Sequence, residues 1–174
     1  MTTPTFPSGP IGYPDWYGNG DPSNGGYPNI ENLLKTLFTP QLSGVLITYW
    51  LPDEATIEAI LNSGGGILRL FRMGGKVNQA ERRDEPNVQV AALTKSRDDS
   101  WELIEFVRTG VLEPFTEAAA IVPGTIHKLH CVGEMVGPQL IPEQFRDERL
   151  VPVTFTLHTW KPKGLPNYRQ ALGL

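Results

Sequence analysis

The sequence predicts an α+β domain in which a mixed, mostly antiparallel sheet of about five strands packs against helices. Two patterns predict the strands: an apolar run at residues 67–73, and alternation of apolar and polar residues at 87–91 and 151–160. A third pattern, apolar residues at helical spacing over residues 96–112, predicts a long helix after the second strand. Elements that follow each other in this way bury their apolar sides against one another.

Residues 67–73 form the strand around which the other elements are arranged. Their sequence, Ile-Leu-Arg-Leu-Phe-Arg-Met, is apolar on both faces except for Arg69 and Arg72, which lie three residues apart and therefore point to opposite faces. The glycine pair at 74–75 gives the backbone the freedom to leave the strand. Residues 76–86 have mixed charges and no apolar period, which predicts a solvated loop or the tip of a long hairpin.

The helix expected at residues 96–112 begins at a clear signal. Ser96 is a capping residue, and Asp98 and Asp99 lie at the positive end of the helix dipole. The predicted apolar face consists of Trp101, Leu103, Ile104, Phe106, Val107 and Val111. A face of this width predicts that the helix packs along the sheet.

Five further elements complete the predicted domain. Asn29 caps a short helix that ends before Pro40, and Asp53 caps a second helix of about ten residues. The first of these helices is expected at residues 30–38, and strands are expected at 45–51, 125–136 and 151–160.

Residues 1–28 differ from the rest of the chain because they are rich in proline and glycine and contain no lysine or arginine. Such a segment cannot build its own core, yet it contains Phe6, Ile11, Tyr13, Trp16, Tyr17 and Tyr27. Two alternatives are open: this arm docks on another molecule, or it folds back over its own domain. The expected organisation is an extended arm at 1–28, a single domain at 29–160 and an extended C-terminal tail at 161–174.

The composition of the 174-residue chain is that of a soluble globular protein, with 40% hydrophobic and 20% charged residues. A net charge of −4 gives no reason to expect nucleic-acid binding driven by overall charge. Cys131 is the only cysteine, which excludes an intrachain disulfide and favours a reducing compartment. The N-terminal residues have no basic region and no apolar run, so they do not resemble a secretory signal. No apolar stretch approaches the roughly 20 residues of a membrane span.

The sequence offers no group of residues that predicts catalysis or metal binding. His127 and His130 point to opposite faces of a strand, so together with Cys131 they do not supply the four ligands of a structural zinc ion. Asp98 and Asp99 diverge on a helix, and their place near its N-terminus explains them better than acid–base catalysis. We therefore expect no enzyme activity, no bound metal and no cofactor.

Four motifs resemble those of the tail terminator proteins of long-tailed phages of the siphovirus type. They are the run from Gly66 to Arg72, the Gly74-Gly75 pair, the segment Asp84-Glu85-Pro86-Asn87-Val88, and the helix start Ser96-Arg97-Asp98-Asp99-Ser100-Trp101. The resemblance covers about residues 45–112 and rests on structural motifs rather than on chemical ones.

This resemblance implies a structural virion protein that forms a ring, usually a hexamer, which caps the tail tube and joins it to the head. The implied partners are further copies of the chain, the tail tube protein, and a head–tail connector or other neck protein. No membrane and no sequence-specific nucleic acid is implied, although the genome would pass through the lumen of the ring. The implied location is the tail and neck of the virion, after assembly in the host cytoplasm.

Two other functions stay open. The nearest is another ring protein of the neck, such as a head–tail connector or a tail completion protein, because the arm and the proline-rich residues 113–150 depart from the simplest form of the family. The second is a small enzyme or nucleic-acid-binding α/β domain. The missing acid–base group argues against an enzyme, and the acidic balance argues against nucleic acid.

In a ring-forming protein, the arm and the charged loop are the segments expected to contact partners. Aromatic side chains offer large contact areas at a small loss of conformational entropy, and a charged loop can project onto a neighbour or into the lumen. The predicted partner-binding residues are Tyr13, Trp16, Tyr17, Tyr27, Lys76, Arg82 and Arg83.

Overall fold

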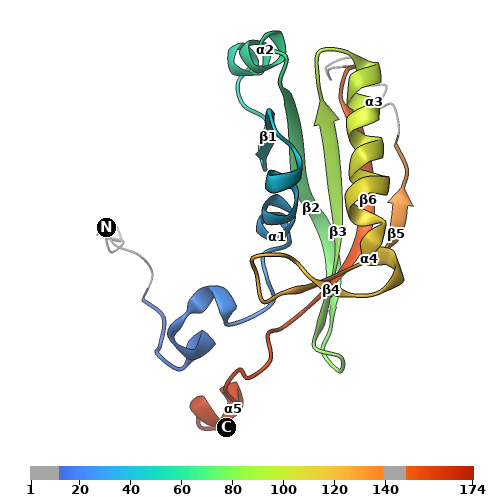
Figure 1. Ribbon diagram of the computed structural model, residues 1–174. Helices are drawn as coiled ribbons and strands as arrows, with labels where there is room; N and C mark the ends of the chain where they lie inside the picture. Colours follow the sequence, from blue (N-terminus) through green and yellow to red (C-terminus); the bar gives the residue numbers. More distant parts are fainter. Residues whose placement is uncertain (1–11, 139–147) are drawn as a thin grey trace, which may run out of the picture. The chain divides into compact units, whose positions relative to one another are not determined.

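A computed structural model describes residues 12–138 and 148–174 of the chain. The chain divides into two compact units (Figure 1). The larger unit is Tyr27–Lys161, and the smaller unit combines Met1–Gly26 with Pro162–Leu174. Residues 1–11 of the expected arm, with Phe6 and Ile11, lie outside the described residues.

The larger unit is built on a six-stranded sheet with the strand order β1-β2-β3-β6-β5-β4. Its strands are β1 Val45–Thr48, β2 Gly66–Asn78, β3 Arg83–Leu93, β4 Ala120–Ile121, β5 Lys128–Val136 and β6 Val151–Trp160. Strand β1 runs parallel to β2, and all other neighbouring strands are antiparallel. The prediction of a mixed, mostly antiparallel sheet packed against helices is confirmed, with the two-residue β4 as an additional strand.

Side-chain caps begin the principal helices of the larger unit. Helix α1 (Ile30–Phe38) starts where the side chain of Asn29 accepts hydrogen bonds from two backbone N–H groups. Helix α2 (Glu54–Asn62) starts at Asp53, whose carboxylate accepts from the backbone N–H and the hydroxyl group of Thr56. Helix α3 (Arg97–Glu105) begins at Ser96, whose hydroxyl oxygen accepts from the backbone N–H of Asp99 at 3.1 Å. All three caps agree with the sequence because short polar side chains satisfy the free N–H groups of a first turn.

The single helix expected at residues 96–112 is instead an α-helix followed by a wider turn. Helix α3 continues into the π-helix η4 (Phe106–Leu112), and α4 (Pro114–Glu117) follows it. The predicted apolar face is partly wrong, since Trp101 and Phe106 are exposed while Ile104 and Val107 are fully buried. The buried face keeps helical spacing, and Phe106, about 200° around the helix axis from Ile104, points away from it.

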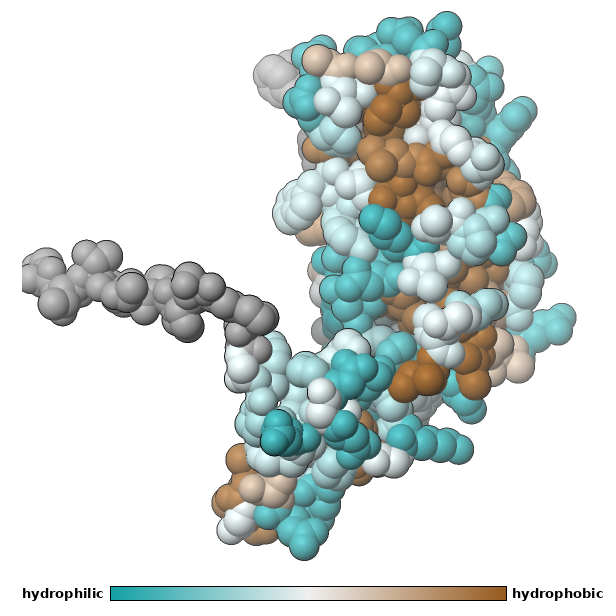
Figure 2. Space-filling view, turned by 60° about the vertical axis from the view of Figure 1, so that its left-hand side comes forward, coloured by the Kyte–Doolittle hydropathy of each residue, from teal (hydrophilic) through white to brown (hydrophobic). Residues whose placement is uncertain are grey.

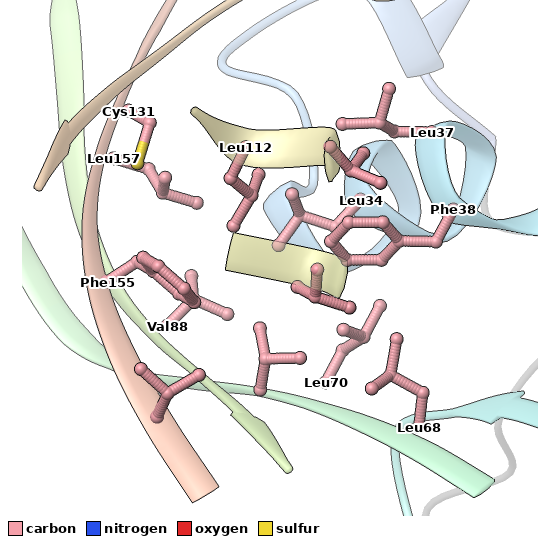
Figure 3. Close-up of a cluster of buried hydrophobic side chains, with 14 of the residues drawn as sticks. Leu34, Leu37, Phe38, Leu68, Leu70, Val88, Leu112, Cys131, Phe155 and Leu157 are labelled. Carbon is pink, nitrogen blue, oxygen red and sulfur yellow. The ribbon is translucent and has the colours of Figure 1, made fainter. Parts of the chain in front are cut away.

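One face of the sheet packs against α1, α3, η4 and α4 and forms the main core. Side chains of the strands meet those of α1 and η4 there (Figure 3). Labelled members are Leu34, Leu37, Phe38, Leu68, Leu70, Val88, Leu112, Cys131, Phe155 and Leu157. Complete burial of one such leucine or phenylalanine stabilises the fold by about 1.5–3 kcal/mol. We call this side of the sheet the packed face.

The opposite face is covered only in part. Ile67, Ala91 and Leu93 point to that side and pack against Leu61 of α2 and against Leu150. Beyond this second cluster, no helix described in the larger unit lies over the strands on that side. We call the remaining part of this side the open face.

Strands β2 and β3 form one long hairpin. The prediction that the chain leaves the strand at Gly74 and Gly75 is wrong, because β2 continues to Asn78. The register shifts between Arg72 and Gly74, immediately before the glycine pair. The two glycines have φ values of 132° and 123°, which favour glycine. A β-carbon on Gly75 would lie 2.3 Å from the carbonyl oxygen of Glu85, so the close approach of the two strands requires glycine there.

The smaller unit contains two 3₁₀-helices, η1 (Tyr17–Gly20) and η2 (Pro22–Asn24), and the short helix α5 (Tyr168–Ala171). Residues 161–174, expected to be extended, therefore include one helical turn. Asn167 caps α5 by accepting a hydrogen bond from the backbone N–H of Arg169.

Candidate functional site

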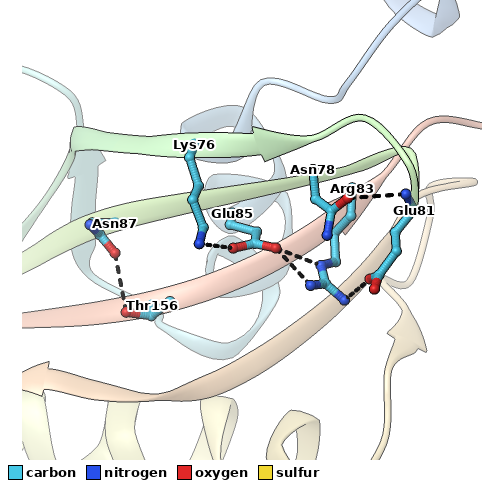
Figure 4. A network of polar contacts seen from close by, with 7 residues as sticks. All are labelled: Lys76, Asn78, Glu81, Arg83, Glu85, Asn87 and Thr156. Atoms are coloured by element: carbon cyan, nitrogen blue, oxygen red, sulfur yellow. Dashed lines mark hydrogen bonds and ion pairs between the residues drawn. The ribbon is translucent and has the colours of Figure 1, made fainter.

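Three of the predicted partner-binding residues lie in the β2–β3 hairpin. The Lys76 ammonium group is 3.5 Å from Glu85, and Arg83 donates to the same carboxylate at 2.6 Å (Figure 4). Arg83 also pairs with Glu81. The hydrogen bond from Arg83 lowers the pKa of Glu85 and raises the pKa of Arg83. These charges are thus brought together and largely balance one another.

Arg82 differs from Lys76 and Arg83. It lies in the turn of the hairpin with a φ of 51°, and its backbone N–H donates to the carbonyl of Gln79. Its guanidinium group forms no hydrogen bond or ion pair with another residue in the part of the chain that the structure describes. Arg82 therefore presents a positive charge at the tip of the hairpin.

The middle of the open face carries a row of polar side chains that bond to each other across the strands. Arg69 donates to Gln89 at 2.6 Å, and the Thr156 hydroxyl group donates to Asn87 at 3.1 Å. The rings of His130 and His158 lie 5.8 Å apart, as expected if β5 and β6 pair. We call these side chains, together with Glu85 and Arg83, the polar row. A face of this kind suits contact with water.

Apolar side chains are exposed at both ends of the open face. At the β1 end, Trp50 is 76% exposed and its ring lies 6.1 Å from that of Phe71. At the β4 end, Val132 is 49% exposed. We call Leu46, Trp50 and Phe71 the first margin, and Ile121, Val132 and Val136 the second margin. Met73, also exposed, lies between them, with its sulfur 3.7 Å from the hydroxyl group of Thr154 on β6. In the view of Figure 2, hydrophobic residues of the larger unit also gather in a band between hydrophilic borders.

The predicted arm residues Tyr13, Trp16 and Tyr17 form an aromatic cluster inside the smaller unit. The rings of Trp16 and Tyr17 each lie 5.5 Å from that of Tyr168. The Tyr168 hydroxyl group donates to the carbonyl of Gly25 at 2.6 Å. The described part of the arm therefore contacts residues 162–174.

Tyr27, the fourth predicted arm residue, belongs to the larger unit. The Lys161 ammonium group lies 4.9 Å from the centre of its ring, a distance typical of a cation–π contact. The structure thus separates Tyr27 from the other three aromatic residues of the prediction.

Cys131 and the histidines, considered above as possible metal ligands, are parts of the sheet and its core. Cys131 lies on the packed face, and burial raises the pKa of its thiol to about 11, so the reactive thiolate is scarce near neutral pH. Burial lowers the pKa of His127 and of His158. Within residues 12–138 and 148–174, no three His, Cys, Asp or Glu residues are grouped to hold a metal ion. No helix in the same ranges is long and apolar enough to cross a membrane.

The sequence matches the family model of the phage tail termination protein over residues 26–166. This match includes the whole of the larger unit. The chain belongs to the phage tail termination protein family. A search of the curated proteins found no match. The family is one of structural tail proteins rather than enzymes, and the chain is a component of the phage tail.

Sequence reasoning missed the two margins of the open face. Their sequence pattern predicts only that Leu46, Phe71 and Val132 belong to strands. The number and length of the predicted helices could have indicated that one face of the sheet is partly uncovered. The helices that follow the strands are too few and too short to cover both faces of a sheet with apolar residues on each side.

Proposed function

We propose that the chain terminates the phage tail by assembling with copies of itself into a ring that caps the tail tube and joins it to the head without any catalytic step. The observation that carries this proposal is the family match over residues 26–166. The proposed partners are further copies of the chain, the tail tube protein and a neck protein. Assembly takes place in the host cytoplasm before the ring becomes part of the virion.

The structure supports the ring in one further way. A closed ring of identical subunits needs two different surfaces on each subunit, one for each neighbour. The strand order places the first margin and the second margin at opposite ends of the sheet. The tip of the β2–β3 hairpin, with Arg82, and the aromatic cluster around Trp16 are then available for the tail tube or the neck.

A tube-growth experiment tests the capping function. Purified tail tube protein is allowed to polymerise with and without this protein, and tube lengths are measured by electron microscopy. We expect shorter tubes that carry the protein at one end only, because a cap blocks addition of further subunits. Unchanged tube lengths would contradict the proposal. Binding to a head–tail connector but not to tube ends would favour the alternative of another neck ring protein.

A further inference from the structure

The smaller unit contains both asparagine–glycine pairs of the sequence, Asn19–Gly20 and Asn24–Gly25. The first pair lies within η1, and the second lies at the end of η2, where Gly25 caps the helix. The two pairs share one chemistry and a similar 3₁₀ backbone context. Any difference in their reactivity in the folded protein must therefore come from their surroundings.

An asparagine that precedes glycine loses its side-chain amide in water without an enzyme. The backbone nitrogen of the glycine attacks the amide carbon of the asparagine side chain, and the proton of this N–H leaves with the side-chain nitrogen as ammonia. The product is a succinimide ring, which water opens at one of its two carbonyl groups to give aspartate or isoaspartate. Glycine favours the attack because it has no β-carbon and a flexible backbone.

The fold holds the Asn24–Gly25 pair in place. The side-chain amide of Asn24 donates to Oδ2 of Asp21 at 2.7 Å. The backbone N–H of Gly25, which carries the attacking nitrogen, donates to the carbonyl of Pro22 at 3.2 Å. Gly25 is also buried, and a β-carbon added to it would lie 2.4 Å from the Tyr17 ring. Ring closure at Asn24 would break both hydrogen bonds in a place with no room for new atoms.

The Asn19–Gly20 pair is held much less firmly. Both residues are exposed, and a β-carbon added to Gly20 would meet no atom within 4 Å. The side-chain amide of Asn19 donates to the carbonyl of Gly164 at 3.3 Å, which is a longer bond than that of Asn24 and is exposed to water. Asn19 has a φ of 57°, which is rare for a residue other than glycine, so leaving this conformation relieves backbone strain.

We propose that Asn19 is a site of spontaneous deamidation in the folded protein, with water as the co-reactant, and that the fold protects Asn24 from the same reaction. The product carries a new negative charge two residues before Asp21. A carboxylate accepts hydrogen bonds but donates none, so the bond that ties Asn19 to Gly164 is lost. This modification goes beyond the proposed function and does not depend on ring formation.

Peptide mapping by mass spectrometry tests the site. The folded full-length protein and the same protein in guanidinium chloride are incubated at mildly alkaline pH, where loss of the glycine N–H proton speeds the attack. Residues 1–28 contain no lysine or arginine, so trypsin leaves both pairs in one peptide and fragmentation spectra identify the modified residue. The denatured sample gives the intrinsic rate of each pair.

We expect both pairs to react at similar rates in guanidinium chloride. In the folded protein, Asn19 should keep most of its intrinsic rate, whereas Asn24 should react about tenfold more slowly or less, because its hydrogen bonds must break first. Asn19→Gln is the matched control, since a glutamine side chain would have to close a larger ring and reacts far more slowly. This variant should show no product at position 19 and an unchanged rate at Asn24.

Three results would overturn the proposal. Equal rates at Asn19 and Asn24 in the folded protein would show that the fold does not protect Asn24. An Asn19 that reacts in guanidinium chloride but not in the folded protein would show that the native turn blocks the attack. An unchanged yield of modified peptide from Asn19→Gln would assign the modification to another residue.

Discussion

Leu70 and Phe71 are neighbours on β2, and their side chains leave the strand toward opposite faces of the sheet. Leu70 is completely buried among the side chains of the packed face, whereas Phe71 is 37% exposed at the first margin. The packed face has helices over most of its length, whereas α2 covers only one end of the other side and leaves the open face uncovered by helices of the larger unit as described. This difference indicates that burial on the packed face supplies most of the stability of the larger unit. The exposed side chains of the open face are then free to contact partners.

The sharpest test of this difference is a pair of alanine substitutions at adjacent residues. Leu70→Ala should lower the free energy of unfolding by about 2–5 kcal/mol, because it leaves a cavity in the packed face. Phe71→Ala should lower it by about 1 kcal/mol or less, because its ring is partly in water. Urea denaturation of the two variants measures both values. Equal losses would show that the open face contributes to the core as much as the packed face does.

A second pair of substitutions tests the hairpin that carries part of the polar row. Gly75→Ala places a β-carbon 2.3 Å from a carbonyl oxygen, while a β-carbon on Gly74 meets no atom within 4 Å. Both positions have positive φ, so both variants lose about 1–2 kcal/mol to backbone strain. Gly75→Ala should lose a further 1–3 kcal/mol because the strands must separate. Thermal melting distinguishes them, and a smaller loss for Gly75→Ala than for Gly74→Ala would contradict the register.

His158, in the polar row, should make the free energy of unfolding depend on pH. Burial, with a contribution from Arg83, lowers the pKa of His158 below its ordinary value of 6.5. The unfolded chain then takes up a proton at higher pH than the folded one, so stability decreases as the pH falls below about 6.5. His158→Gln should flatten this decrease. Unfolding measured near neutral pH and in mild acid tests it, and an unchanged slope would mean that His158 is not responsible.

The smallest expected change in stability is that of Trp16→Ala. Trp16 contacts Tyr17 and Tyr168 within the smaller unit, so the free energy of unfolding of the larger unit should change by less than about 0.5 kcal/mol. Assembly of complete particles should be impaired, because Trp16 is one of the predicted partner-binding residues and large aromatic side chains often dominate an interface. A large loss of stability in the larger unit would contradict the division into two units. Normal particle assembly would show that Trp16 does not bind a partner.

Much of the fold follows from local signals in the sequence. Asn29, Asp53 and Ser96 mark the starts of helices because capping depends on residues within one turn. The alternation of residues 151–160 likewise predicts β6, since Val151, Val153, Phe155 and Leu157 all point to the packed face. The length of the β2–β3 hairpin was not predictable in the same way. A glycine pair usually ends a strand. Only the register of the hairpin, with Gly75 opposite Pro86, shows that Gly74 and Gly75 lie within β2.

The candidate site was harder to predict because exposure depends on the whole fold. Lys76 and Arg83 were identified from their charge, but their common partner Glu85 follows from the register of the hairpin. Trp50 and Val132 belong to the site only because the sheet has no helix over them in the larger unit as described. Phe106 shows the same limit, since it is apolar but lies on the side of its helix that faces away from the core.

The most direct test of the account compares the mass and the stability of two proteins, the unmodified chain and Trp50→Glu. We predict that mass photometry gives the unmodified protein a single closed assembly several times its 19.3 kDa monomer mass. Trp50→Glu should have the same melting temperature but a monomer mass, because Trp50 contributes to assembly and not to folding. Equal masses for the two proteins, or a loss of stability that accompanies the loss of assembly, would contradict the separation of the two faces.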